Sequence, residues 1–308
     1  MIAAVACTVA SGVLGGASVA RADDGPQAVP GAKPAADARP VPPPAPLPPA
    51  TEPPPVDIAK AAKELDPTVE KILSRLEQRK VDDLVAQVKW ELSDVFADET
   101  DTKRGMIWFK EFDPVAKFLV HFDKKIVDGR ERDLSEKHMF DGRWYHELQP
   151  KTKTLIRREV RRETDTSNPY KIGEGPFPLP FGQKKADLLR EFEIRYTDQS
   201  EGGPTGADHL ILTPRAGTRT GRLYRQVDFW VAREGKEAGL PVMVKAARKD
   251  GMGEVNEYMS VTMEKIRVND GFAASLFQID PPAGYEEITE RLDPPPGAAQ
   301  VEISGEKP

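Results

Sequence analysis

An Asp-Gly pair at residues 141–142 lies between two runs of alternating side chains. Asp-Gly in this setting is the strongest short-range signal for a β-hairpin with a two-residue type I′ turn, because glycine accepts the positive φ that the turn requires. Such a turn pairs Phe140 with Arg143 and His138 with Tyr145. The sequence therefore predicts two antiparallel strands, with large aromatic rings in the second.

Similar short runs recur along the chain, and most of them are joined by short connections without a helix between them. This pattern predicts an antiparallel sheet. A sheet of this size must curl or be covered on one face, because it has an apolar side to bury. The runs lie at 88–93, 105–110, 118–123, 138–149, 154–156, 210–212, 226–231, 241–245, 259–264 and 277–279.

Two amphipathic helices are available as that cover. The first is predicted over 68–80, where Asp66 can cap the helix and Pro67 fits its first turn. The second is predicted over 184–192, after an apolar, proline-stiffened loop at 175–182. We expect the helices and this loop to form the lid and rim of the sheet. The lid and rim candidates are Ile72, Leu73, Leu76, Phe177, Leu179, Phe181 and Leu188.

The composition divides the chain into four segments. Residues 1–22 are apolar and end in Ala20–Ala22, the A-x-A pattern of a secretory signal peptide, so cleavage after Ala22 and a periplasmic location are predicted. A membrane anchor and a lipidated Cys7 are the alternatives. Residues 23–56 are a proline-rich linker, read either as an extended spacer or as a disordered tail. A domain at 57–290 and a disordered tail at 291–308 follow.

The charge and the residue inventory exclude several classes of function. The net charge of −6 argues against a nucleic-acid-binding protein, which needs a basic surface. The single cysteine excludes disulfides and cysteine-based metal sites. His138 and His146 point to opposite faces of the predicted hairpin, so no metal site is expected. No catalytic or cofactor-binding motif is present, so neither an enzyme nor a cofactor is predicted.

A basic patch is present at Arg157-Arg158 and Arg161-Arg162, interrupted by Glu159. One interpretation is that it docks an acidic partner or an anionic head group. The alternative is that these residues are the ordinary exposed end of a strand.

Four motifs in order resemble the LolA-type periplasmic lipoprotein carriers and outer-membrane lipoprotein-sorting proteins. They lie at 105–109 (GMIWF), 140–145 (FDGRWY), 210–215 (LILTPR) and 277–284 (FQIDPPAG). The resemblance covers about residues 68–288. It implies a mainly β fold, an open, incomplete antiparallel β-barrel whose apolar concave face is lidded by helices.

The resemblance also implies a function. Such a protein binds the acyl chains of a lipoprotein or lipid in its cavity and carries them across the cell envelope as a monomer, exchanging them with inner- and outer-membrane lipoprotein-transfer proteins. The alternative is an envelope-stress sensor, a protein-interaction module on the same fold. The carriers tie the lid down with a basic residue after the Trp-containing strand. Here Glu111 lies near that position, and Lys110 is the substitute.

The aromatic and apolar residues of the strands either line a ligand cavity or fill a core, and the resemblance favours the cavity for part of them. Methionines would give that lining an adaptable surface. The predicted lining residues are Trp90, Trp108, Phe118, Val120, Phe122, Trp144, Leu212, Phe229, Met259, Val261 and Met263.

Overall fold

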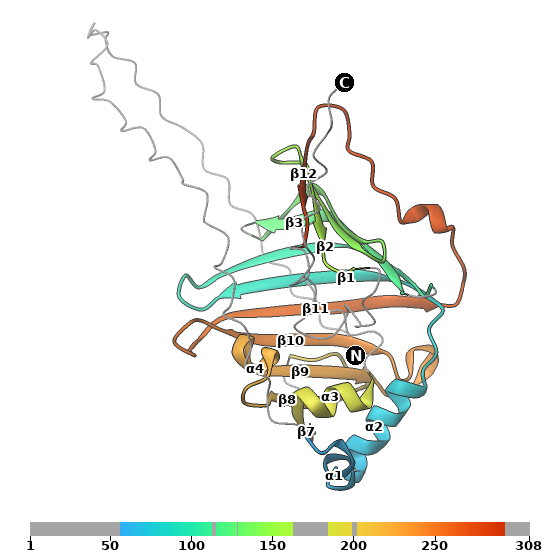
Figure 1. Ribbon diagram of the computed structural model, residues 1–308, viewed down its shortest axis with the longest axis vertical. Coiled ribbons are helices and arrows are strands. Elements are labelled where there is room, and N and C mark those ends of the chain that lie inside the picture. Colours follow the sequence, from blue (N-terminus) through green and yellow to red (C-terminus); the bar gives the residue numbers. More distant parts are fainter. Residues whose placement is uncertain (1–55, 113–114, 128, 163–183, 199–201, 293–308) are drawn as a thin grey trace, which may run out of the picture. The chain divides into compact units, whose positions relative to one another are not determined.

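A computed structural model describes residues 56–112, 115–127, 129–162, 184–198 and 202–292, and these form one mainly β unit with helices (Figure 1). The predicted signal peptide, nearly all of the linker and the rim loop 175–182 lie outside them. The strands are β1 (Asp83–Asp94), β2 (Glu99–Lys110), β3 (Lys117–Val127), β4 (Arg130–Phe140), β5 (Trp144–Gln149), β6 (Thr154–Glu159), β7 (Phe192–Thr197), β8 (Ala207–Pro214), β9 (Tyr224–Ala232), β10 (Pro241–Lys249), β11 (Val255–Val268) and β12 (Glu286–Glu290). The helices are α1 (Ile58–Lys63), α2 (Pro67–Gln78), α3 (Lys185–Glu191) and α4 (Arg219–Leu223).

All the strands join one twelve-stranded sheet in the order β12-β6-β5-β4-β3-β2-β1-β11-β10-β9-β8-β7. The sheet is open, because β12 and β7 are its two ends and do not pair. Neighbouring strands in the sheet run antiparallel, except that β12 runs parallel to β6. Figure 1 shows β7–β11 running across the view and β12 standing upright, so the sheet is strongly twisted. The predicted mainly β, open antiparallel fold with helices is confirmed.

The predicted hairpin forms, but the prediction of a two-residue turn at residues 141–142 is wrong. Phe140 pairs with Tyr145 instead of Arg143, and His138 pairs with Glu147 instead of Tyr145. The connection of residues 141–143 is closed by a side chain, because Asp141 Oδ1 accepts hydrogen bonds from the backbone N–H of residues 143 and 144 at 3.0 and 2.8 Å. The register moves by two residues, so each side chain keeps its predicted face.

The two predicted helices are confirmed within two residues of their bounds. α2 begins as expected, with Pro67 in its first turn and Asp66 Oδ1 accepting a hydrogen bond from Thr68 N–H at 2.7 Å. The sequence did not predict α1 or α4. α4 forms because the Thr218 hydroxyl caps it, accepting from Gly221 N–H at 2.9 Å.

The two faces of the sheet carry different covers. α2 and α3 pack on one side, where Ile72 and Leu188 meet Phe229 of β9; we call this the helix face. Residues 272–285, which we call the strap, pack on the opposite side, where Phe277 meets Leu119 of β3; we call this the strap face. Paired residues share a face, and neighbours in a strand alternate except at a β-bulge, so the register assigns the strand positions to one of the two faces.

Gly105 in the middle of β2 allows a close approach of β3. A Cβ at this position would lie 1.9 Å from the carbonyl oxygen of His121, a backbone atom that cannot rotate away. We expect Gly105→Ala to lower the free energy of unfolding by about 1–3 kcal/mol through overpacking. Urea denaturation measures this, with Gly251→Ala as the control because nothing lies within 4 Å of its added Cβ. Equal stabilities of the two variants would contradict the prediction.

Candidate functional site

The helix face of the central strands is an apolar surface. Trp90 of β1 pairs with Val261 of β11, which pairs with Val244 of β10 and so with Phe229 of β9. The register on the other side places Val120 of β3 on this face as well. The predicted lining residues that share the helix face are Trp90, Phe118, Val120, Phe122, Leu212, Phe229, Met259, Val261 and Met263.

Aromatic rings link the strands of this face. Phe118 of β3 stacks on Phe140 with ring centroids 6.2 Å apart and meets Tyr145 at 6.5 Å. Trp90 meets Phe122 at 6.5 Å across β2. Edge-to-face and offset contacts of this kind add to the stabilisation from burial alone. The rings therefore form two apolar groups on the helix face, one from β1 to β3 and one from β3 to β5.

Trp108 and Trp144 do not share the face with the other predicted lining residues. Trp108 follows Ile107 in β2, so it points to the strap face and packs with Phe277 and the strap. Trp144 precedes Tyr145 and also points to the strap face, where Arg143 and Arg291 lie 5.7 and 5.5 Å from its ring. Neither tryptophan can line a cavity on the helix face, because its side chain lies on the opposite face of the sheet.

A chain of polar side chains crosses the same helix face and is almost buried. Lys103 Nζ of β2 donates to both carboxylate oxygens of Glu136 at 2.8 and 2.9 Å. Glu136 Oε1 lies 2.6 Å from His138 Nε2, and His138 Nδ1 lies 2.7 Å from the Tyr145 hydroxyl. Lys103 and Glu136 keep 17% and 15% of their side chains exposed. Lys103 Nζ also lies 5.1 Å from the Trp90 ring centroid.

The pKa values along this chain follow from burial and from the partners. Burial raises the pKa of Glu136, but hydrogen bonds from His138 and Lys103 outweigh it and lower the pKa to about 2. Burial raises the pKa of Tyr145 well above its usual value, and the negative charge of Glu147 adds to this. Tyr145 therefore stays protonated at neutral pH. The sequence pattern did not predict this row of polar side chains, since Lys103 and Glu136 are far apart in the sequence.

The helical lid candidates lie over one end of the helix face. Ile72, Leu73 and Leu188 are buried, and Leu76 packs against them. They meet Leu212 and Phe229, which are predicted lining residues and are fully buried under the helices. The rim candidates Phe177, Leu179 and Phe181 lie outside the described residues.

Lys110, the substitute for the basic residue that ties down the lid, contacts the strap instead. Its Nζ donates to the carbonyl oxygen of Phe272 at 3.0 Å and lies 5.2 Å from the ring centroid of Phe272. Lys110 follows Phe109, a helix-face residue, so it points to the strap face. In the described residues its contacts hold the strap to β2 rather than α2 to the sheet.

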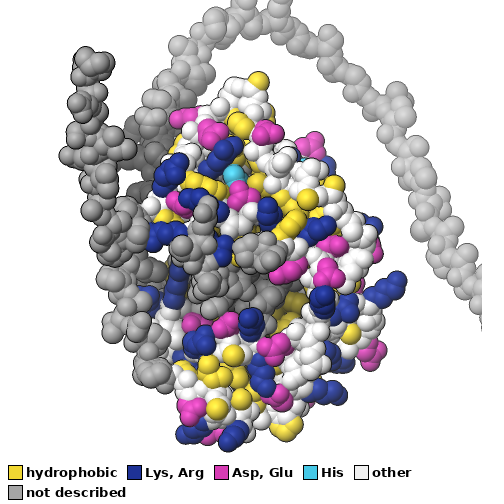
Figure 2. Space-filling model, turned by 45° about the vertical axis from the view of Figure 1, so that its right-hand side comes forward, with side chains coloured by type: hydrophobic (Ala, Val, Ile, Leu, Met, Phe, Trp, Pro, Cys, Tyr) yellow, Lys and Arg dark blue, Asp and Glu magenta, His cyan; other side chains and the backbone are white. Residues whose placement is uncertain are grey.

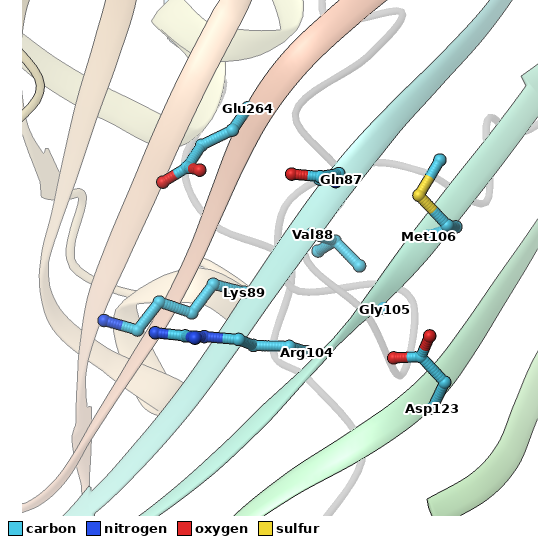
Figure 3. Close-up of a pocket in the computed structure, with 8 residues that line it drawn as sticks. All are labelled: Gln87, Val88, Lys89, Arg104, Gly105, Met106, Asp123 and Glu264. Atoms are coloured by element: carbon cyan, nitrogen blue, oxygen red, sulfur yellow. The ribbon is translucent and has the colours of Figure 1, made fainter. Parts of the chain in front are cut away.

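A polar hollow of about 380 Å³ opens on the strap face of β1 and β2 (Figure 3). It contains none of the predicted site residues. Lys89 and Arg104 extend side by side in it, but they are paired with Glu91 at 2.7 Å and Glu131 at 3.1 Å. The hollow is lined by Gln87, Val88, Lys89, Arg104, Gly105, Met106, Asp123 and Glu264.

The described residues contain no group of three potential metal ligands. His138 lies on the helix face, and His146 lies on the strap face, where its Nε2 is 2.8 Å from Asp141 Oδ2.

None of the helices in the described ranges is long and apolar enough to span a bilayer. On the surface seen in Figure 2, basic and acidic side chains are interspersed.

No family model matches the sequence, and no curated protein matches it. Among solved structures, the chain is similar to an uncharacterised conserved protein from Thermus thermophilus, with 11% identity, a TM-score of 0.39, and coverage of 72% of this chain and 99% of the other. It is similar to a lipoprotein-sorting protein domain from Vibrio parahaemolyticus (14% identity, TM-score 0.36, 72% and 97% covered). A LolA superfamily protein from Nitrosomonas europaea is 12% identical (TM-score 0.32, 68% and 97% covered). Similarity this low assigns neither a family nor an activity.

Proposed function

We propose that this protein binds the acyl chains of a lipoprotein or lipid on the helix face and carries them across the cell envelope. One observation carries the proposal: the predicted lining residues from Met259 and Val261 to Phe118 share one face of an open sheet, the face on which α2 lies. Burying an alkyl chain there gains about 0.8 kcal/mol per methylene. Such a site needs an apolar surface and a few polar anchors. The Lys103–Glu136 pair gives it a polar anchor.

The mechanism in this proposal is binding and release without bond chemistry. α2 rests on the sheet through a narrow stripe, in which Val69, Ile72 and Leu73 are buried, so a shift of the helix would open the face. The carrier would work in the periplasm as a monomer without a cofactor. Its partners would be inner- and outer-membrane lipoprotein-transfer proteins.

Native mass spectrometry of the full chain, purified without detergent from a secreting host, tests the proposal. A mass excess that organic extraction removes and identifies as acylated lipid or lipopeptide is the expected result. A clean apo mass, with no uptake of a fluorescent fatty-acid probe, would mean that the aromatic residues are core. The sensor hypothesis would then replace the carrier.

Neighbouring positions in β11 provide a matched pair of variants. Met263 points to the helix face and is 4% exposed, whereas Thr262 points to the strap face. We expect Met263→Gln to weaken uptake of the fatty-acid probe about tenfold, because an unpaired amide against alkyl chains costs about 1–3 kcal/mol. Thr262→Gln should bind as the parent does. Equal loss in both variants, at unchanged thermal midpoints, would place the ligand elsewhere.

A further inference from the structure

The strand at one end of the sheet, β12, is held differently from the others. It is the one parallel neighbour in the described sheet, paired with β6 from Glu286 opposite Thr154 to Glu290 opposite Arg158. All five of its residues are exposed, so no side chain of β12 is part of the core.

Charged side chains hold β12 to the edge of β6. Arg157 pairs with Glu287 at 3.1 Å and Arg158 pairs with Glu290 at 2.7 Å. Beyond the strand, the Arg291 guanidinium lies 5.5 Å from the Trp144 ring centroid. The basic pair 157–158 of the sequence is thus occupied by two carboxylates three residues apart.

These contacts are weak enough to be exchanged. In both ion pairs the side chains keep between 30% and 53% exposure, and exposed pairs contribute about 0–1 kcal/mol each. A strand without buried side chains opens at low free-energy cost. The strap stays anchored through buried Phe277 and Ile279, so β12 would leave without disturbing the strap face.

The edge of β6 remains organised without β12. Arg158 also pairs with Glu147 at 2.9 Å, which keeps the guanidinium at the edge. The unpaired backbone of an edge strand is a template for another extended segment. The basic side chains select the charge of that segment.

We propose that the β6 edge is a docking site for an extended acidic segment of a partner protein, and that β12 occupies it in the absence of the partner. The segment carries two carboxylates three residues apart, facing Arg157 and Arg158, followed by a cation for the Trp144 ring. This inference is independent of the lipid-carrier proposal.

The test uses the full chain and a labelled peptide with the sequence of residues 284–292. In the variant Glu287→Lys/Glu290→Lys, the native strand is repelled by Arg157 and Arg158. We expect faster amide exchange at residues 286–290 and at least tenfold tighter peptide binding than to the parent, by fluorescence anisotropy. Binding should weaken as salt is raised. Glu286→Lys is the matched control, since it reverses a charge without breaking either ion pair.

Four results would overturn the proposal. The first is slow exchange at 286–290 in the double variant, since the ion pairs would then not hold β12. The second is free β12 without peptide binding. The third is equal binding of a peptide with lysines at both glutamate positions. The fourth is a dimer of the parent chain that the double variant abolishes, which would assign the edge to a second copy.

Discussion

Glu136→Gln is expected to lower the free energy of unfolding at pH 7 by about 3 kcal/mol. The pKa of Glu136 is lowered from 4.5 to about 2 in the folded protein, and each pKa unit corresponds to about 1.4 kcal/mol. The amide also leaves the ammonium group of Lys103 almost buried without its counter-charge, which is costly. Urea denaturation of parent and variant measures the difference.

The pH dependence of this difference has a fixed sign. Because the folded pKa of Glu136 lies below its ordinary value, the carboxylate stabilises the fold fully above about pH 4.5. That contribution is lost as the pH falls towards about 2. The stability difference between parent and Glu136→Gln should therefore shrink between pH 5 and pH 3.

Glu91→Gln is the control for this experiment. Glu91 pairs with Lys89 at 2.7 Å on the strap face, and both side chains are about one third exposed. Its loss should cost about 0–1 kcal/mol. If the two variants were equally stable at pH 7, the Lys103–Glu136 pair would contribute no more than a surface ion pair.

Phe229→Ala is expected to lower the free energy of unfolding by about 3–5 kcal/mol. The side chain is fully buried on the helix face, where it packs with Val69, Ile72 and Leu73 of α2. Truncation removes its apolar contacts and leaves a cavity under α2. Urea denaturation measures the effect.

Phe96→Ala is the matched control for Phe229→Ala, because Phe96 is 76% exposed in the turn between β1 and β2. Its removal should change the stability by less than about 0.5 kcal/mol. A loss below 1 kcal/mol for Phe229→Ala would mean that α2 does not rest on the sheet as described.

Local patterns in the sequence predicted most of the elements of this fold, but not β7 or β12, and the strand predicted at 277–279 is wrong because these residues belong to the strap. Alternating side chains predicted most of the strands, and the apolar stripe of Val69, Ile72, Leu73 and Leu76 predicted α2. The start of α2 was predictable because Asp66 and Pro67 act within one turn. α4 was missed because its cap, Thr218, stabilises a helix too short for any periodicity.

Long-range pairing decided the rest. The hairpin register depended on how the Asp141 side chain closes the turn, and the pairing of β1 with β11 joins segments far apart in the chain. Alternation along a strand shows which side chains share a face, but not whether that face lies under the helices or under the strap. Trp108 and Trp144 were therefore grouped with residues of the opposite face.

The sequence by itself determined most of the strands and the two longer helices, and that their apolar sides need a cover, because these properties depend on neighbours along the chain. The tertiary structure alone decided which apolar side chains share a face and that Lys103, Glu136 and His138 meet on it. It also decided that Arg157 and Arg158 face the carboxylates of β12. The physical reason is that strand order and register set these contacts, and both depend on hydrogen bonds between residues distant in sequence.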